Sequence, residues 1–253
     1  MKNRLFRTPV PVLLFLFCAA PAVLTARPVF WLDLETGAAF TGYNDVQIPA
    51  DTGTAFSLAE DLDPRTVWFY RIQLGMDWGR HSLQALYAPL RILSNGTAGG
   101  DISFNGELFT AGTALEGEYI FNSYRLSWAY TLMEGDKLRF AAGITGKIRD
   151  ASIGLRSATA ESVRTNLGFV PLIHLEFQWR FAPELSFLLA GDGLAAPQGR
   201  AEDFLAALLF SPASSDMEFR LGYRILEGGS DGGGSVYTFS LFHYLGAGIR
   251  YRL

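Results

Sequence analysis

The sequence predicts an all-β protein, a single antiparallel up-and-down transmembrane β-barrel of about ten strands, within a range of eight to twelve. Apolar and polar residues alternate through many segments, and the 253 residues include 49% hydrophobic residues, 14% aromatic residues and 27 glycines. Side chains alternate faces along a strand, so one face suits lipid and the other suits a polar lumen. After residue 26 there is no run of about 18 uncharged apolar residues, so no transmembrane helix is predicted.

The clearest alternating segment is the last, Ser235 to Leu253, which is predicted to be the closing strand. One face carries apolar residues from Tyr237 to Leu253 with His243 among them, while Phe242 is the one large apolar residue on the lumen face. The final residues, Gly248 to Leu253, resemble the C-terminal signal that outer-membrane barrels present to their assembly machinery, with Leu in place of the usual Phe. We therefore expect that machinery to be a partner.

The first 26 residues are predicted to be a cleaved secretory signal, and residues 27–253 to be the barrel domain. Basic residues precede an apolar core from Val10 to Ala20, and small residues end the segment at Ala26. The only cysteine, Cys18, lies in this segment, so neither disulfides nor thiolate metal sites are expected after it. Removing the segment's three basic residues leaves 18 basic against 25 acidic residues, a net charge of about −7, so nucleic acid is not an expected partner.

The predicted strands are joined by short turns at one end and long polar loops at the other. They cover residues 30–43, 68–78, 81–93, 115–132, 138–149, 163–181, 185–194, 201–210, 217–225 and 235–253. Residues 201–210 also have helical composition, but flanking Gly and Pro residues favour a strand. An even strand count places both termini in the periplasm, so the loops 44–65 and 94–114 are expected to be extracellular.

One strand changes its apolar face. After Ala88-Pro89 the apolar residues move from odd to even positions, to Leu90 and Ile92. Proline donates no ladder hydrogen bond, so we expect a β-bulge at this point.

The short turns predict two contacts inside the barrel, because lipid-facing residues must pair with lipid-facing residues. Pairing Phe181 with Leu185 makes His174 and Asp192 cross-strand neighbours. Pairing Phe210 with Met217 sets Asp203 opposite Arg224.

The predicted lumen contains many charged residues of both signs. An unpaired buried charge is costly, so these residues are expected to neutralise one another in hydrogen-bonded networks. A barrel of about ten strands is narrow enough for its side chains to fill. We therefore expect a largely filled lumen, and the alternative is a narrow porin-like channel for small solutes.

An enzymatic function depends on His174 beside Asp192, which could serve an outer-membrane hydrolase as an acid/base pair. A pair of this kind more often orients or stabilises, and no second Asp pair faces it. Ser186 lies about 20 Å from Asp192 along its strand, too far for a catalytic triad. Three separated histidines form no metal cluster. We expect no enzyme, no cofactor and no metal site.

Six motifs distributed over nearly the whole chain carry a family resemblance. They are Asn44-Asp45-Val46-Gln47-Ile48-Pro49, Phe121-Asn122-Ser123-Tyr124-Arg125-Leu126, Lys147-Ile148-Arg149-Asp150-Ala151, Gly168-Phe169-Val170-Pro171-Leu172, Asp192-Gly193-Leu194-Ala195 and Tyr223-Arg224-Ile225-Leu226-Glu227-Gly228-Gly229. Together they resemble a family of bacterial outer-membrane β-barrels that have no established activity. The resemblance implies a barrel in the outer membrane and supports the strand at 201–210, but it implies no ligand.

Charged residues gather at the outer mouth and in the lumen beneath it. The candidate ligand or network residues are Lys147, Arg149, Asp150, His174, Asp192, Arg200, Asp203, Arg224 and Glu227. Charge-assisted pairing would either pin the loops or receive an anionic group such as a lipopolysaccharide phosphate. The sequence therefore predicts a non-enzymatic outer-membrane protein with a structural or surface-interaction role, whose partners are outer-membrane lipid and lipopolysaccharide.

Overall fold

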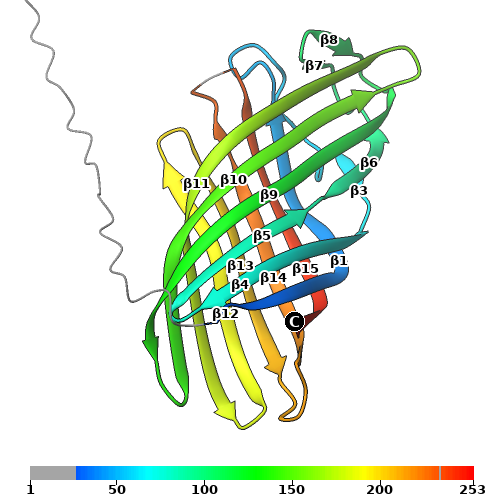
Figure 1. Cartoon of the computed structure of the whole chain (residues 1–253). Helices are drawn as coiled ribbons and strands as arrows, with labels where there is room; N and C mark the ends of the chain where they lie inside the picture. The colour runs from blue at the N-terminus through cyan, green and yellow to red at the C-terminus, as the bar shows by residue number, and fades with distance from the viewer. Residues whose placement is uncertain (1–26, 234) are drawn as a thin grey trace, which may run out of the picture.

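The computed structural model describes residues 27–233 and 235–253, which form β-strands and loops (Figure 1). The predicted signal at residues 1–26 lies outside the described residues. Ten long strands are β1 (Val29–Gln47), β4 (Val67–Trp78), β5 (His81–Ala88), β9 (Ala114–Glu134), β10 (Leu138–Arg156), β11 (Glu161–Ala182), β12 (Leu185–Ala196), β13 (Gly199–Phe210), β14 (Met217–Asp231) and β15 (Tyr237–Arg252). Within the described ranges, no helix has the length and apolar character needed to cross a membrane.

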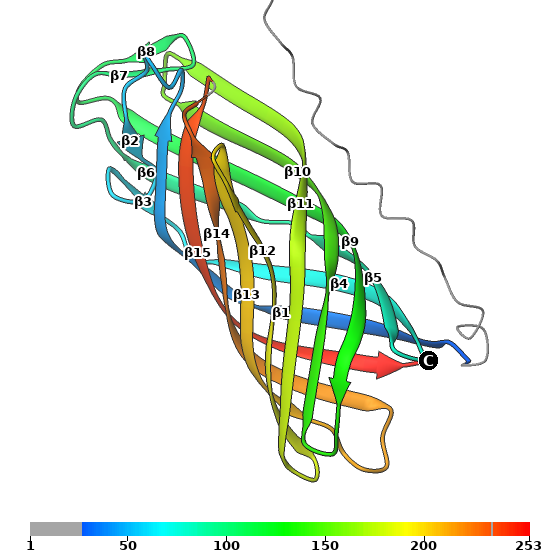
Figure 2. The ribbon, with the colours of Figure 1, turned by 90° about the vertical axis from the view of Figure 1, so that its left-hand side faces the viewer.

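The ten strands close into one barrel. Each pairs antiparallel with its neighbours in the order β1-β4-β5-β9-β10-β11-β12-β13-β14-β15, and β15 pairs with β1 to complete the ring. The predicted ten-stranded antiparallel barrel is confirmed, including a strand at residues 201–210. The 21, 19 and 22 residues of β9, β10 and β11 exceed the roughly 9–11 that cross a bilayer, so these strands extend beyond it. Figure 2 shows how far they rise toward the outer loops.

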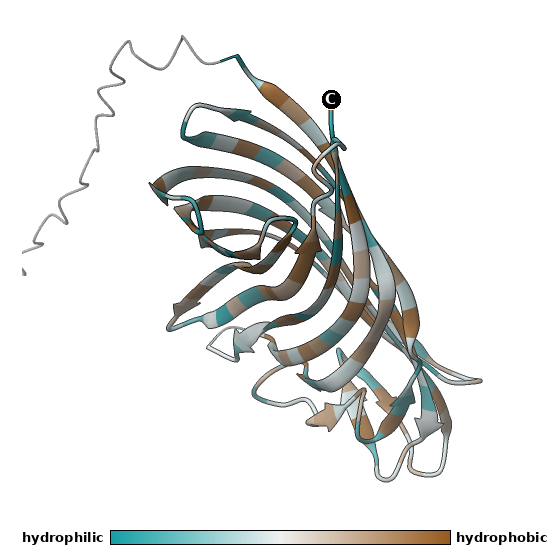
Figure 3. Cartoon of the chain, turned by 90° about the horizontal axis from the view of Figure 1, so that it is seen from below, coloured by the Kyte–Doolittle hydropathy of each residue, from teal (hydrophilic) through white to brown (hydrophobic). Residues whose placement is uncertain are grey.

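Large apolar side chains cover the outside of the barrel. On β11 alone, Leu167, Phe169 and Ile173 are 74%, 70% and 53% exposed. Figure 3 shows apolar and polar residues alternating along the strands. Soluble monomers rarely expose so extensive an apolar surface. The exterior therefore matches the lipid-facing surface predicted for a transmembrane barrel.

The outer end of the barrel contains an apolar core formed partly by the long loops. These loops carry the short strands β2 (Phe56–Ser57), β3 (Leu62–Pro64), β6 (Arg91–Thr97), β7 (Ile102–Phe104) and β8 (Glu107–Phe109). Phe104 and Phe109 of the β7–β8 hairpin are fully buried, and they join Phe242 of the barrel wall in one cluster. The interior is therefore polar at mid-height and apolar near the loops.

The bulge expected at Pro89 is wrong. The change of the interior from polar to apolar explains instead why the apolar residues shift from odd to even positions there. Ala88 pairs with Ser123 and Arg91 with Ile120, so the register along β9 is unbroken across the proline. The even-numbered apolar residue Ile92 points inward and is 1% exposed, within the outer core. The apolar residues change position because the interior, rather than the strand, changes character.

The cross-strand pairing of His174 with Asp192 is confirmed. It arises from a different turn than expected, because Ala182 rather than Phe181 pairs with Leu185 and the register shifts beside it. The unexpected register shift offsets the wrong turn pairing, so His174 still pairs with Asp192 inside the lumen.

The expected pairing of Phe210 with Met217 is wrong by two residues. Phe210 pairs with Phe219, which sets Leu226 rather than Arg224 opposite Asp203. A slip of two residues keeps every side chain on its predicted face. The long Arg224 side chain still reaches Asp203 diagonally, with Nη1 2.6 Å from Oδ1.

Candidate functional site

A buried network of ion pairs crosses the middle of the lumen. Its centre is Asp203 on β13, which is 2% exposed. Three guanidinium groups form ion pairs with it, from Arg71 at 3.2 Å, Arg125 at 2.6 Å and Arg224 at 2.6 Å. Arg71 on β4 and Arg125 on β9 reach it from strands that do not neighbour β13 in the sheet. The network therefore ties distant parts of the wall together through the lumen.

The network continues toward the short-turn end of the barrel through two acids of β1. Arg220 contacts Asp33 at 2.8 Å and Glu35 at 3.1 Å. Arg224 bridges Glu35 to Asp203, and Arg250 donates to Asp33 at 3.1 Å. Alternation placed these side chains on one face of each strand, and the barrel then brings the faces together.

His174 and Asp192 form a hydrogen-bonded pair within this network. His174 Nδ1 lies 2.9 Å from Asp192 Oδ1, and both residues are buried. Asp192 also accepts hydrogen bonds from Arg125 at 2.8 Å and Thr145 at 2.6 Å. The second ring nitrogen of His174 faces Gln84 at 3.4 Å. With this carboxylate so fully engaged, the geometry supports a structural role for the pair.

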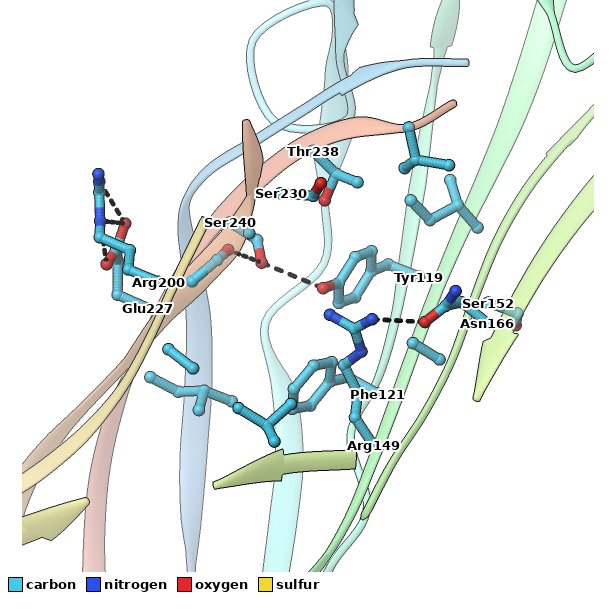
Figure 4. Close-up of a pocket in the computed structure, with 18 of the residues that line it drawn as sticks. Tyr119, Phe121, Arg149, Ser152, Asn166, Arg200, Glu227, Ser230, Thr238 and Ser240 are labelled. Atoms are coloured by element: carbon cyan, nitrogen blue, oxygen red, sulfur yellow. Dashed lines mark hydrogen bonds and ion pairs between the residues drawn. The ribbon is translucent and has the colours of Figure 1, made fainter. Parts of the chain in front are cut away.

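The interior contains two cavities that share no lining residue, and network residues such as Arg71, Arg125 and Asp203 line the smaller one. The smaller, about 70 Å³, includes Gln73, His174 and Glu176 on the short-turn side. The larger, about 160 Å³, lies toward the loops and is lined by strands β9, β10, β11, β13, β14 and β15. We call this larger space the outer cavity. Figure 4 shows Tyr119, Arg149, Arg200 and Ser240 arranged around it.

The most unusual residue of the outer cavity is Lys147 on β10. It lines the cavity and is 2% exposed. Its ammonium lies 4.6 Å from the centre of the Phe121 ring, a cation–π contact. Among the residues that the structure describes, it makes no hydrogen bond and no ion pair. A buried ammonium normally has such a partner.

Two arginines add to the positive charge of the cavity. Arg149 donates through Nη2 to Asn166, and Arg164 donates through Nη2 to Ser235 at 3.3 Å. The Nε atom of each arginine is buried with no hydrogen-bond partner in the described part of the chain. Neither arginine has a carboxylate partner there, so three cations face the cavity without an opposing acid.

The one acid that lines the cavity is already neutralised. Glu227 receives hydrogen bonds from Arg200 Nη2 at 2.6 Å and Nε at 2.8 Å, and from Tyr43 at 2.5 Å. Arg200 also stacks on the ring of Phe239, with its guanidinium carbon 4.8 Å from the ring centre. This pair therefore fastens β13 to β14 and offers no counter-charge to Lys147.

The structure thus divides the predicted site residues into three groups. His174, Asp192, Asp203 and Arg224 belong to the buried network, whereas Lys147, Arg149, Arg200 and Glu227 line the outer cavity. Asp150 is exposed on the outer face of β10, where Asn122 donates to it at 3.2 Å, and it does not reach the cavity.

Sequence reasoning missed the apolar wall of the cavity. Tyr119 and Phe121 lie on the inward face of β9, beside Phe242 of β15. The signal was present, since alternation placed Phe242 in the lumen as an isolated apolar residue. Only the closed barrel shows that two more aromatic residues meet it.

Solved structures with a similar fold are outer-membrane barrels. The outer membrane protease OmpT of Escherichia coli superposes on the chain with a TM-score of 0.55 at 9% identity, covering 89% of this chain and 97% of that one. The chain has the fold of an outer-membrane β-barrel. An identity this low establishes the fold alone.

Two further solved structures superpose on the chain with lower scores. Ail, the attachment invasion locus protein of Yersinia pestis, in complex with sucrose octasulfate, has a TM-score of 0.40 at 7% identity, covering 88% of this chain and 99% of that one. Neisserial surface protein A has a TM-score of 0.34 at 13% identity, covering 88% and 97%. No family model matches the chain, and no curated protein matches it in sequence.

Within residues 27–233 and 235–253 of this outer-membrane barrel fold, no three His, Cys, Asp or Glu side chains gather as metal ligands would. The lining of the outer cavity offers charge and apolar surface to a ligand. Its cations face inward, its aromatic residues form a wall, and the ion-pair network lies beneath it.

Proposed function

We propose that this protein is a non-enzymatic surface-interaction barrel of the bacterial outer membrane, with both termini in the periplasm, and that its outer cavity binds an anionic ligand. The observation that carries the proposal is the group of three cations, Lys147, Arg149 and Arg164, around a cavity whose only acid is already paired. A ligand arriving from outside the cell would meet this cavity before the buried network.

The energetic argument concerns Lys147 in particular. Burying an ammonium without a partner costs several kcal/mol, on the order of the effective penalty for one desolvated ion. Asp192 and Asp203 are the buried network acids best placed to neutralise the ammonium of Lys147, but both already form ion pairs with Arg125. A ligand anion beside Lys147 would offset that cost and would also satisfy the free Nε donors of Arg149 and Arg164.

The same arrangement favours a closed barrel over a narrow porin-like channel. The ion pairs of Asp203 and Glu35 join side chains from different strands across the lumen. Removing them would leave buried charges unpaired, so the network resists opening. A surface-binding role requires only the outer half of the interior.

The anion has two natural sources at the cell surface. One is a phosphate of lipopolysaccharide, which we propose as a partner together with outer-membrane lipid. The other is a soluble anion that enters through the loops. Both would be recognised by the same charge-assisted hydrogen bonds.

Lysine labelling tests the proposal directly, because Lys137 and Lys147 are the only lysines after residue 26. The protein would be produced with ¹³Cε-lysine, reconstituted in amphipol, and titrated with lipopolysaccharide, inorganic phosphate, acetate and benzoate in separate NMR experiments. We expect at least one anion to shift the Lys147 signal while the Lys137 signal, from a turn at the other end, stays in place. The signal that disappears from the spectrum of the Lys147→Gln variant is thereby assigned to Lys147.

A matched control removes a cation that does not line the cavity. Arg156 ends β10 at the outer rim, where it donates to the exposed Glu161 at 2.5 Å and thereby lowers the pKa of that carboxyl. Arg156→Gln should leave the response of Lys147 unchanged, whereas Arg149→Gln should weaken it. If no anion in the panel moves the Lys147 signal, the proposed function is wrong.

A further inference from the structure

The outer cavity also restricts which anion it can hold. We infer that its ligand is a small monocarboxylate whose apolar part, an aromatic ring or a short alkyl chain, is about the size of benzene. This inference rests on the proposed function, because it names the ligand class of the same cavity. Three features support it: the volume, the wall and the position of the charge.

The volume sets the size of the buried group. The outer cavity measures about 160 Å³. An apolar protein cavity of about 150 Å³ is known to hold one benzene molecule. A phosphorylated disaccharide is several times larger, so lipopolysaccharide could present only a phosphate at the rim. A ligand that enters the cavity must be no larger than a single ring or a short chain.

The wall sets the chemistry of that group. Tyr119, Leu226 and Phe242 line the cavity and are at most 6% exposed. The Tyr119 and Phe242 rings lie 5.2 Å apart in a tilted arrangement. The Tyr119 hydroxyl already pairs with Ser240 at 3.1 Å, so the residue offers its ring rather than its oxygen. These three residues contribute apolar surface and little hydrogen bonding, so the part of a ligand that meets them should be a hydrocarbon, while Ser152, Ser230 and Thr238 also line the cavity.

The charge lies against the same wall. Lys147 sits over the ring of Phe121, which also lines the cavity. Lys147 and Arg149 are two residues apart on one face of β10, about 7 Å along the strand. One carboxylate beside Lys147 could therefore meet the ammonium while its hydrocarbon part contacts the aromatic residues. A multiply charged phosphate would bring more charge and no apolar surface into the same space.

The test compares benzoate with acetate and inorganic phosphate by calorimetric titration of the folded barrel in amphipol, with protein-free amphipol as the blank. Benzoate and acetate carry the same charge, so their difference reports the contribution of the ring. Burying the ring should favour benzoate over acetate by about tenfold or more. Lys147→Gln should lower benzoate affinity by about tenfold or more, because it removes a charge-assisted hydrogen bond in a desolvated site.

A second variant separates loss of the pocket from loss of the fold. Ala201 lines the outer cavity, and Ala201→Leu should fill the space that the ring would occupy. We expect this variant to lose benzoate binding, to keep the acetate response of Lys147, and to retain the heat-shifted gel mobility of a folded barrel. Arg156→Gln should bind benzoate as the wild type does.

The outcomes distinguish the two proposals. Equal binding of benzoate, acetate and phosphate would overturn the monocarboxylate assignment while leaving anion binding in place. Tighter binding of phosphate or lipopolysaccharide than of benzoate would do the same and point to a headgroup at the rim. If no anion shifted the Lys147 NMR signal, both anion binding and the monocarboxylate assignment would be wrong. A clear preference for benzoate that is lost in both Lys147→Gln and Ala201→Leu would support the inference.

Discussion

At the scale of single residues, the molecule contains two contrasting kinds of buried charge. Asp203 receives three guanidinium groups in the middle of the lumen. Lys147 lies nearby in the interior but has only an aromatic ring as its described partner. The first arrangement is self-sufficient and therefore structural. The second is incomplete, and for that reason it is the residue on which the functional proposal depends.

Replacing Asp203 by Ala should destabilise the barrel strongly, because three buried guanidinium groups would lose a shared partner. We expect the free energy of unfolding to fall by about 3–5 kcal/mol, the range for breaking a buried ion pair. Urea titration in lipid vesicles, followed by tryptophan fluorescence, measures the change. Asp150→Ala, which removes an exposed carboxylate from the outer face, is the matched control and should change stability little. Equal stability of the two variants would contradict the structural role of the network.

At the scale of elements, the β7–β8 hairpin reaches across the outer mouth. Its tip is Asn105-Gly106, with positive φ angles of 49° and 92° that suit a tight hairpin turn. The Asn105 side chain donates to Ser162 Oγ at 3.2 Å and to the Val163 carbonyl at 3.3 Å, and its backbone nitrogen donates to Ile48. The hairpin is therefore attached both to β11 and to the first loop, near the outer cavity.

Asn105→Ala should loosen this attachment, since alanine adopts positive φ poorly and lacks the amide. We expect faster cleavage between residues 97 and 114 in limited proteolysis, with the barrel itself intact. Asn105→Gly tolerates the positive φ while losing the amide, so it isolates the contribution of the two side-chain hydrogen bonds. It should fall between wild type and Asn105→Ala. Resistance of Asn105→Ala equal to that of wild type would show that the apolar residues alone hold the hairpin.

At the scale of the whole molecule, the interior changes along its height. The ion-pair network lines a polar cavity at mid-height, and nearer the loops the apolar core forms part of the wall of the outer cavity. The network spans the barrel because its members come from nonadjacent strands. Under the proposed function, a barrel organised in this way holds a ligand in its outer half and passes no solutes.

Planar bilayer recording should therefore show no discrete conductance steps for the wild-type barrel. The double variant Arg220→Gln, Arg224→Gln removes guanidinium groups that neutralise Asp33 and Glu35, and it should admit small cations. Conductance steps from the variant would show that the barrel inserts into the bilayer. The absence of steps from the wild type could then be attributed to a closed lumen rather than to failed insertion. Stepwise conductance from the wild type would favour the porin-like alternative instead.

The sequence by itself determined the strands and most of their faces, because alternation with a period of two is a local property of each strand. It placed Phe242 inside and paired His174 with Asp192, as the structure shows. Only the tertiary structure decided the register of β13 against β14 and the direction of Ile92. A two-residue slip preserves every face, so local pattern cannot detect it. The isolation of Lys147 is likewise a property of the closed barrel. It depends on which side chains from distant strands come close enough to neutralise the charge of Lys147.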